Sequence, residues 1–308
     1  MQQVIRIGTR ESQLALWQAY YIQDRIEKSG YKTEIVKIKS EGEINLTSPL
    51  YELGVQGIFT KNLDLALLNN KIDIAVHSLK DVPTQVATGL FHAATPERGN
   101  CNDILILRSK QAPDFSEPLT IASSSLRRQA QWLNKYPNHT LVPLRGNINS
   151  RLQKLLTNEQ WSGTIMAAAG VERIALAVPH FIELDWMLPA PSQGALGVFC
   201  RTDDSFIRTV CDELNDKNTF LCTNAERMFL RTLMGGCTMP IAAHAYISNE
   251  RLYFKGNVLS IDGTKKSEIE IQVPVRDAEL VGINAAELIL ADGGKEILSQ
   301  LKSSNAKN

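Results

Sequence analysis

The sequence lacks the cysteine and histidine patterns of metal sites and of disulfide frameworks. Its five cysteines, an odd number, stand at positions 101, 200, 211, 222 and 237, and no two have C-x-x-C spacing. Its five histidines are scattered without the spacing of metal ligands. Neither a structural zinc site nor a disulfide scaffold is therefore supported.

An excess of charge and long apolar runs are also missing. Lys plus Arg and Asp plus Glu each number 33, so no overall charge favours nucleic acid or an acidic membrane surface. No apolar stretch approaches the length that spans a bilayer, and Arg6, Arg10 and Glu11 make residues 1–15 unlike a signal peptide. We expect a soluble cytoplasmic protein that binds neither nucleic acid nor membrane and acts as a monomer.

What the sequence does contain is an alternation of apolar strands and amphipathic helices. The first strands are expected at Val4 to Ile7, Glu34 to Ile38 and Ile72 to Val76, with helices near 12–28 and 60–69. This alternation predicts mainly parallel sheets with covering helices. The length of 308 residues predicts about two or three domains.

The alternation continues from about residue 103 to residue 188. The expected strands are Ile104 to Leu107, Leu119 to Ala122, Thr140 to Leu144 and Thr164 to Ala168. The stiff segment Leu188-Pro189-Ala190-Pro191 then leads to a strand at Ala195 to Cys200, which could rejoin the first sheet. The section is therefore expected to form a second βα domain.

The order of the expected elements changes near residue 220, where the alternation of single strands and helices ends. A helix near 219–233 leads to a glycine-rich loop, and alternating strands follow near 242–248, 251–259 and 266–273. Helices near 277–291 and 294–302 close the chain. These elements predict a small C-terminal α+β domain.

The most informative motif is His77-Ser78-Leu79-Lys80-Asp81-Val82-Pro83, which follows an apolar strand. Strand ends in α/β domains are where sites are built. A solvated loop would also account for Lys80 and Asp81 taken alone. His77 is interpreted as a hydrogen-bonded structural histidine.

A second group of motifs combines serines with arginines. Ser123-Ser124-Ser125 precede the helical stretch Leu126 to Leu133, where the free amides of a helix N-terminus accept anions. Arg127 and Arg128 add forked donors suited to carboxylate or phosphate, and Arg145 and Arg151 follow the next strand. The alternative is a set of exposed surface arginines. Together they predict a local site for a small polyanion.

The third motif is the loop Met234-Gly235-Gly236-Cys237-Thr238-Met239-Pro240. Two glycines let the backbone turn freely, and a thiol on such a loop is accessible. An incidental loop cysteine and a redox sensor are the alternative interpretations. Cys200, by contrast, ends an apolar run and is expected to be buried.

As a set, these motifs resemble the porphobilinogen deaminase family, the hydroxymethylbilane synthases. IRIGTRESQLALWQ at residues 5–18, GIFTKNLDLALL at 57–68, PLRGNINSRL, AAAGVERI, PAPSQGALGV and GGCTMPIAAHA occur in the order typical of the family. The resemblance runs from about residue 4 to about residue 300. It implies two periplasmic-binding-protein-like βα domains joined by a hinge, followed by the α+β domain. The implied boundaries are 1–98 with 196–216, 99–195, and 217–308.

The resemblance also implies an activity. Family members join four porphobilinogen molecules head to tail into hydroxymethylbilane, in porphyrin and haem biosynthesis, on a covalent dipyrromethane primer. Cys237 matches the thiol that carries the primer, and Asp81 matches the carboxylate that stabilises a pyrrole cation and moves protons. The matching binding positions are Arg10, Ser12, Lys61, Ser78, Lys80, Ser123, Ser124, Ser125, Arg127, Arg128, Arg145, Arg151, Arg173 and Gln193. The arginines are expected to contact only ligand and water.

Several positions depart from the family pattern, and two other classes stay open. Gln56 and Glu172 stand where Lys is usual, and Glu41 and Glu43 stand where Arg-Gly-Asp is common. These departures bear on substrate affinity and elongation rate more than on the class of reaction. A solute-binding protein would need a secretory signal and has no use for Cys237. A cysteine-nucleophile enzyme would pair Cys237 with His244. A chromophoric adduct would separate the three classes.

Overall fold

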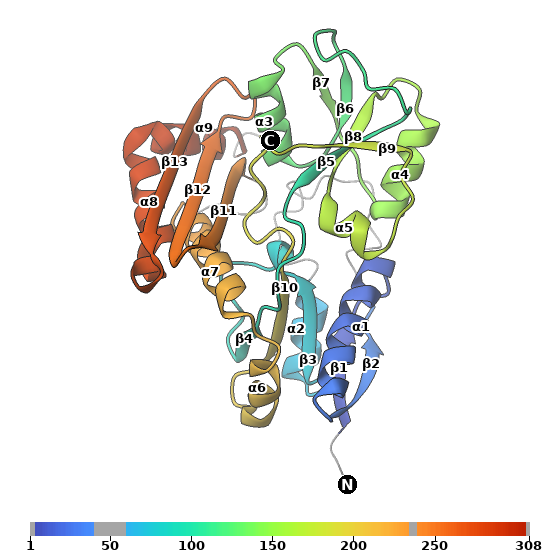
Figure 1. Cartoon of the computed structure of the whole chain (residues 1–308), viewed down its shortest axis with the longest axis vertical. Coiled ribbons are helices and arrows are strands. Elements are labelled where there is room, and N and C mark those ends of the chain that lie inside the picture. Colours follow the sequence, from blue (N-terminus) through green and yellow to red (C-terminus); the bar gives the residue numbers. More distant parts are fainter. Residues whose placement is uncertain (1–3, 40–59, 234–238, 306–308) are drawn as a thin grey trace. The chain divides into compact units, whose positions relative to one another are not determined.

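The computed structural model describes residues 4–39, 60–233 and 239–305, which divide into two compact units (Figure 1). The first unit holds residues up to Gly99 together with Gly194–Phe220, and the second holds Asn100–Gln193 and the chain from Leu221 onward. The chain thus leaves the first unit near residue 99 and returns at residue 194. The domain boundaries drawn from the sequence stay a prediction.

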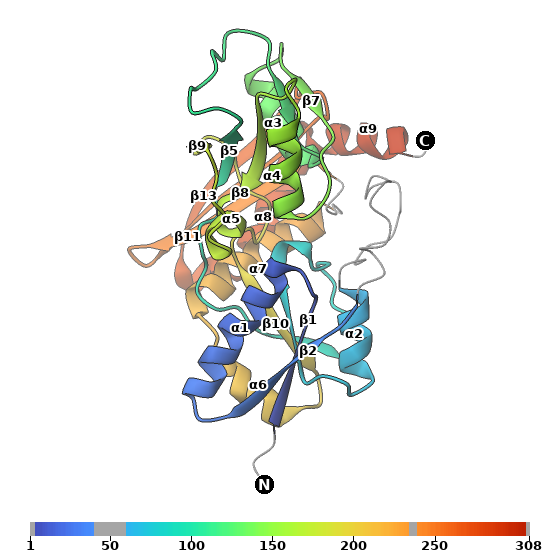
Figure 2. The ribbon, with the colours of Figure 1, turned by 90° about the vertical axis from the view of Figure 1, so that its right-hand side faces the viewer.

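The first unit is built on one five-stranded sheet of order β2-β1-β3-β10-β4. Its strands are β1 (Val4–Thr9), β2 (Lys32–Lys37), β3 (Ile74–Ser78), β4 (Leu90–Ala94) and β10 (Leu196–Arg201). Helices α1 (Gln13–Lys28) and α6 (Ser205–Asp212) pack on one face and α2 (Lys61–Leu68) packs on the other. Figure 2 shows α1 and α2 on opposite sides of these strands.

The return of the chain into this sheet confirms one expectation and refines another. Strand β10 lies between β3 and β4, so the segment after the proline-rich crossover does rejoin the first sheet. It runs antiparallel to both neighbours, whereas β1 is parallel to β2 and β3. Strands β1, β2, β3 and β4 therefore point the same way and β10 alone opposes them, so the sheet is mainly parallel in strand direction but mixed in its pairings, because a strand that returns from another unit need not follow the βαβ rule.

The second unit contains a five-stranded sheet of order β7-β6-β8-β5-β9. Its strands are β5 (Asp103–Leu107), β6 (Thr120–Ala122), β7 (Thr140–Val142), β8 (Gly163–Ala167) and β9 (His180–Glu183). Again β6 is parallel to its neighbours and β5 is antiparallel to both of its own. The covering helices are α3 (Leu126–Lys135), α4 (Ile148–Thr157) and α5 (Ala168–Arg173), with Trp132 of α3 fully buried in the core.

The C-terminal section forms the α+β arrangement that its pattern predicts. An antiparallel sheet of β11 (Ile241–Ser248), β12 (Arg251–Leu259) and β13 (Lys266–Pro274) packs with α7 (Lys217–Thr232), α8 (Val281–Ile289) and α9 (Lys295–Asn305). A 3₁₀ turn (Val275–Leu280) precedes α8 and a π turn (Leu290–Gly294) follows it. Phe229 lies so close to Gly256 that a Cβ there would be 2.6 Å from its ring, so this strand position requires glycine.

Two side-chain hydrogen bonds tie this section to residues 100–193 within the second unit, and a third joins two of its own elements. The amide of Asn134 donates to the carbonyl of Gly263 at 2.7 Å. The fully buried carboxylate of Glu226, on α7, accepts the backbone N–H of Ser192 at 2.5 Å and that of Ala245, on β11, at 2.7 Å. Ser192 has a φ of 64°, so this carboxylate stabilises a left-handed residue that is not glycine. Glu226 thus joins three separate segments.

Candidate active site

In the first unit, the predicted residues lie at the edge where parallel strands end. Strands β1 and β3 are adjacent and parallel, so Arg10, which follows β1, and Ser78, the last residue of β3, leave the sheet at the same edge. Lys80 and Asp81 come next, in a 3₁₀ turn over Leu79–Asp81, and both are partly exposed. This edge is where α/β sheets bind ligands.

Two helices begin at the same edge. Ser12 is the N-cap of α1, and its hydroxyl accepts the N–H of Ala15, while Gln18 of the same helix donates to the hydroxyl of Ser78 at 2.7 Å. Lys61 is exposed and opens α2. The structure therefore gathers Arg10, Ser12, Lys61, Ser78, Lys80 and Asp81 in one region of the first unit.

His77 lies beneath this edge as a buried neutral ring. Burial, and secondarily the charge of Arg10, lower the pKa of His77 to about 3. The ring packs edge-on against Phe199 at a centroid distance of 5.8 Å. Among the described residues its Nε2 has no hydrogen-bond partner. At that nitrogen the ring is therefore held by packing and not by the expected hydrogen bond.

In the second unit, two of the predicted arginines surround a buried aspartate. Asp103 is fully buried at the start of β5. Arg127 Nη1 lies 2.8 Å from its Oδ2, and Arg128 Nη2 lies 2.7 Å from its Oδ1. Gln193 Nε2 donates to Oδ1 at 2.9 Å and to the carbonyl of Cys101 at 2.8 Å. We call Asp103, Arg127, Arg128 and Gln193 the Asp103 cluster.

The charges of this cluster do not cancel. Burial alone would raise the pKa of Asp103, but the guanidinium groups of Arg127 and Arg128 hold it well below its usual range. One carboxylate faces two guanidinium groups, so a net positive charge stays in the protein interior. The buried Nε of Arg127 has no partner within the part of the chain that the structure describes. An anion bound beside the cluster would be stabilised by this uncompensated charge.

These contacts correct the expectation that the arginines touch only ligand and water. Arg127 also donates to the carbonyl of Leu188 at 2.8 Å, and Arg128 donates to that of Ile165 at 2.9 Å. Their side chains are 5% and 7% exposed. Both arginines thus make contacts that stabilise the fold, independently of any ligand. They are buried because the face of α3 that carries them packs against the buried Asp103.

The serine motif is divided between capping and anchoring. Ser125 is the N-cap of α3, as expected, although its side chain makes no capping hydrogen bond. Ser123 accepts the N–H of Ser125 at 3.3 Å. The hydroxyl of Ser124 accepts the N–H of Leu144 at 2.8 Å and donates to its carbonyl at 3.0 Å. Ser124 therefore fixes the exit of β6 beside the segment that leads to Arg145.

The remaining arginines of the second unit are partly exposed. Arg145 precedes α4, and Arg151 lies in its first turn with Nε donating to the carbonyl of Gly146 at 2.8 Å. Gly146 has a φ of 116°, which only glycine adopts readily, and this bend turns its carbonyl toward Arg151. Arg173 ends α5. Their partial exposure leaves them accessible to ligand.

Two residues of the site region were not predicted. Asp103 stands directly before the apolar run Ile104 to Leu107, and a carboxylate at the start of a buried strand is the signal that could have identified it. Glu226 lies in a helix without a distinguishing pattern. Glu172, one of the family departures, accepts a hydrogen bond from Asn100 at 2.8 Å. Cys237, Gln56, Glu41 and Glu43 lie outside the described residues.

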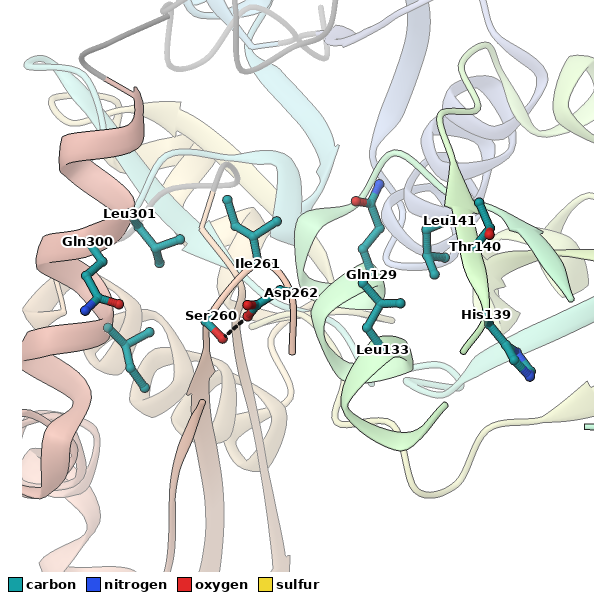
Figure 3. A pocket seen from close by; sticks show the side chains of 11 residues that line it. Gln129, Leu133, His139, Thr140, Leu141, Ser260, Ile261, Asp262, Gln300 and Leu301 are labelled. Carbon is teal, nitrogen blue, oxygen red and sulfur yellow. Dashed lines mark hydrogen bonds between the residues drawn. The ribbon is translucent and has the colours of Figure 1, made fainter. Parts of the chain in front are cut away.

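A separate hollow of about 570 Å³ lies in the second unit (Figure 3). It is lined by Gln129 and Leu133 of α3, by the turn that carries Ser260 and Asp262, and by residues of α9 including Leu301. None of the predicted binding residues lines it.

No group of three or more His, Cys, Asp or Glu that could hold a metal occurs among the described residues. Nor is any helix in those same ranges long and apolar enough to cross a membrane.

Comparison with known proteins decides the family. The family description "Porphobilinogen deaminase, dipyromethane cofactor binding domain" matches residues 5–209, and "Porphobilinogen deaminase, C-terminal domain" matches residues 220–291. The chain belongs to the porphobilinogen deaminase family. A porphobilinogen deaminase of Geobacter sulfurreducens is 42% identical over 96% of this chain and 94% of its own length. One of Desulforamulus reducens is 40% identical over 98% and 99%.

Similarity to solved structures is weaker. The methionine-binding protein MetQ covers 70% of this chain and 92% of its own, with a TM-score of 0.42 and 12% identity. The VFT2 domain of Bordetella pertussis BvgS covers 73% and 90%, with a TM-score of 0.39 and 14% identity. The α/β fold class is therefore taken from the two mixed sheets and the C-terminal α+β section themselves, which agree with the predicted class.

Proposed function

We infer that the chain is a hydroxymethylbilane synthase, a transferase that deaminates porphobilinogen and joins four units head to tail into the linear tetrapyrrole of porphyrin and haem biosynthesis. Its membership of the porphobilinogen deaminase family across residues 5–209 and 220–291 carries this conclusion. Those two ranges include every residue predicted for the site. The reaction class is a condensation with loss of ammonia.

The residues of the second unit fit the dipyrromethane primer. Each pyrrole of the primer bears two carboxylates, and the Asp103 cluster carries a net positive charge with a buried Nε of Arg127 that has no partner in the described chain. Arg145, Arg151 and Arg173, with Ser123, Ser124 and Ser125, supply further donors. Cys237 would attach the primer through a thioether. When bound, the primer supplies the nucleophilic pyrrole end on which the product is built.

Asp81 is assigned the central role in the first unit. Loss of ammonia from porphobilinogen leaves a cationic methylene-pyrrole, and a carboxylate beside its NH stabilises that cation and moves protons. Arg10, Ser12, Lys61, Ser78 and Lys80 share the sheet edge with Asp81 and would bind the carboxylate arms of the substrate. The neutral His77 beneath them adds no charge to compete with Arg10.

The setting of the enzyme is proposed from the same reasoning. We place it in the cytoplasm as a monomer, with porphobilinogen and the growing oligopyrrole as its ligands and no nucleic acid or membrane partner. Balanced charge across the sequence supports this setting. Size-exclusion chromatography with light scattering measures the molar mass of the protein in solution. A dimer at micromolar concentration would contradict the monomer.

The function is tested by mass and by product. The protein purified from cells that make porphobilinogen should carry a mass excess of two porphobilinogen units less two ammonia, localised to Cys237 by peptide mapping. It should also convert porphobilinogen into hydroxymethylbilane. Cys237→Ser should lose both properties, while Cys222→Ser, at a buried cysteine of α7, should keep them. An active protein of unmodified mass would refute the primer assignment.

The same measurement separates the two other classes. A solute-binding protein would release porphobilinogen unchanged and carry no adduct. A cysteine-nucleophile enzyme that used Cys237 and His244 would show a transient adduct from its own substrate. The structure gives His244 a different described sulfur neighbour, Cys101 at 3.3 Å, so the Cys237–His244 pairing is not needed to account for this histidine.

A further inference from the structure

A thiol and an imidazole meet in the second unit outside the proposed active-site residues. Cys101 Sγ lies 3.3 Å from His244 Nε2, within hydrogen-bond range for sulfur. Cys101 precedes β5, and His244 lies on β11, 143 residues later in the chain. The pair therefore exists only in the folded protein.

Both partners are held in place by neighbours. The carbonyl of Cys101 accepts a hydrogen bond from Gln193 at 2.8 Å, which fixes the backbone of the thiol. The ring of His244 stacks on that of Tyr246 at a centroid distance of 5.8 Å, and Tyr246 stacks on Tyr253 at 5.0 Å. The contact is thus supported from both sides.

Cys101 differs from the other described cysteines in access. Its side chain is partly exposed, whereas Cys200 and Cys211 are 0% exposed and Cys222 is 4% exposed within apolar cores. Reactive cysteines combine partial exposure with a neighbour that stabilises the thiolate, and buried apolar cysteines are inert. Of the four, Cys101 meets both conditions.

We propose that Cys101 is a nucleophilic thiol, activated by His244, that is covalently modified by small soft carbon electrophiles. The Nε2 of neutral His244 accepts the thiol proton, and the sulfur lone pair forms a bond to the electrophilic carbon. With an alkyl iodide the carbon–iodine bond breaks and iodide leaves, so the products are a thioether, iodide and imidazolium. This modification site goes beyond the proposed function, because the condensation of porphobilinogen does not use Cys101.

The test is competitive alkylation of the full-length, primer-loaded protein. A limiting amount of iodoacetamide at pH 7 is quenched at intervals, and peptide mass spectrometry gives the alkylated fraction at each cysteine. Cys101 should react at least about tenfold faster than Cys200, Cys211 or Cys222. His244→Phe keeps an aromatic ring against Tyr246 but removes the base, and it should slow Cys101 about tenfold.

The controls make each outcome decisive. Tyr246→Phe keeps the stacked ring and should leave the rate at Cys101 unchanged. The buried cysteines report folding in the same sample, and if His244→Phe exposed them, His244→Gln would replace it in the comparison. Reaction at Cys101 no faster than at Cys222, or an undiminished rate in the folded histidine variant, overturns the proposal. Peptide mapping at Cys101 does not depend on the primer or on turnover, so this failure is distinct from failure of the proposed function.

Discussion

Each compact unit buries a titratable side chain beside its proposed binding residues, His77 in the first and Asp103 in the second, and one is kept neutral while the other is kept ionised. In the first unit, burial and the charge of Arg10 lower the pKa of His77 to about 3, so the ring is neutral at physiological pH. In the second unit, Arg127 and Arg128 hold the pKa of Asp103 well below its usual range, against the effect of burial, so the carboxylate is ionised.

The difference shows what each environment requires. A neutral ring needs only packing, and Phe199 provides it. A buried carboxylate needs partners for its charge, and the cluster supplies two guanidinium groups and the amide of Gln193. Removing a partner from the Asp103 cluster leaves a buried charge without a counter-charge. Altering His77 mainly changes how the unfolding free energy depends on pH.

The largest effect is expected from Asp103→Asn. Two guanidinium groups would stay buried without a counter-charge, and breaking a buried pair in this way costs about 3–5 kcal/mol. Denaturant unfolding followed by tryptophan fluorescence, to which the buried Trp132 of the second unit contributes, measures the loss. Asp81→Asn, at a partly exposed position, serves as the control and should stay within about 0.5 kcal/mol of the parent protein. Equal stability of the two variants would contradict the account of the cluster.

Asp81→Asn should instead reduce turnover. The substitution keeps the size of the side chain but removes the charge proposed to stabilise the pyrrole cation. The expected loss is about 2.7–4 kcal/mol of transition-state stabilisation, a hundredfold to a thousandfold in kcat. Steady-state kinetics of primer-loaded protein measure this change. Asp24→Asn, at an exposed carboxylate paired with Lys28 on α1, is the matched control and should leave kcat unchanged. Near-normal turnover in Asp81→Asn would remove it from the mechanism.

His77 should impose a pH dependence on stability. Its folded pKa is depressed, so between pH 6.5 and about 3 the unfolded chain binds a proton that the folded chain does not. Stability from this residue is therefore present above pH 6.5 and is lost as pH falls. Between pH 7 and pH 5 the parent protein should lose about 2 kcal/mol more unfolding free energy than His77→Phe. Parallel stability curves for the two proteins would show that the ring is not kept neutral.

The smallest effect on stability is expected from Arg151→Leu. Its partly exposed side chain gives up a hydrogen bond to Gly146, and we expect a loss below about 1 kcal/mol, whereas Arg128→Leu should lose several times more. Arg151→Leu should nevertheless alter the distribution of enzyme-bound intermediates when porphobilinogen is limiting. Mass spectrometry resolves those intermediates, and Arg151→Lys should restore the distribution only in part. A normal distribution in the Leu variant would make Arg151 an ordinary surface residue.

The sequence predicts the elements of this fold better than it predicts their pairing. Apolar runs locate β1, β3, β5 and β10, because burial on both faces of a sheet leaves a continuous signal. Strand β9 was not predicted because it is short and its residues are largely exposed. The antiparallel entry of β10 depends on where the chain has been between residues 99 and 194, and no local pattern records that path.

The candidate site divides along the same line. The serine and arginine motifs lie at strand exits and helix starts, where propensity and capping rules locate them. The burial of Arg127 and Arg128 could not be predicted, because it depends on Asp103, a partner 24 and 25 residues away in the chain. Long-range pairing decides whether an arginine faces a ligand or the interior, and spacing alone does not.

The two hydrogen bonds of Glu226 have a consequence for how this chain can be divided. The carboxyl group belongs to α7 and accepts hydrogen bonds from Ser192, which has a left-handed backbone, and from Ala245 of β11. Asn134 adds a second connection by donating to Gly263. A cut that separated residues 100–193 from the C-terminal section would remove the Ser192 donor from the buried carboxyl group of Glu226 and the Asn134 donor from Gly263. In terms of modularity, we expect the C-terminal section to fold poorly when it is expressed without residues 100–193, which supply the donors at Ser192 and Asn134.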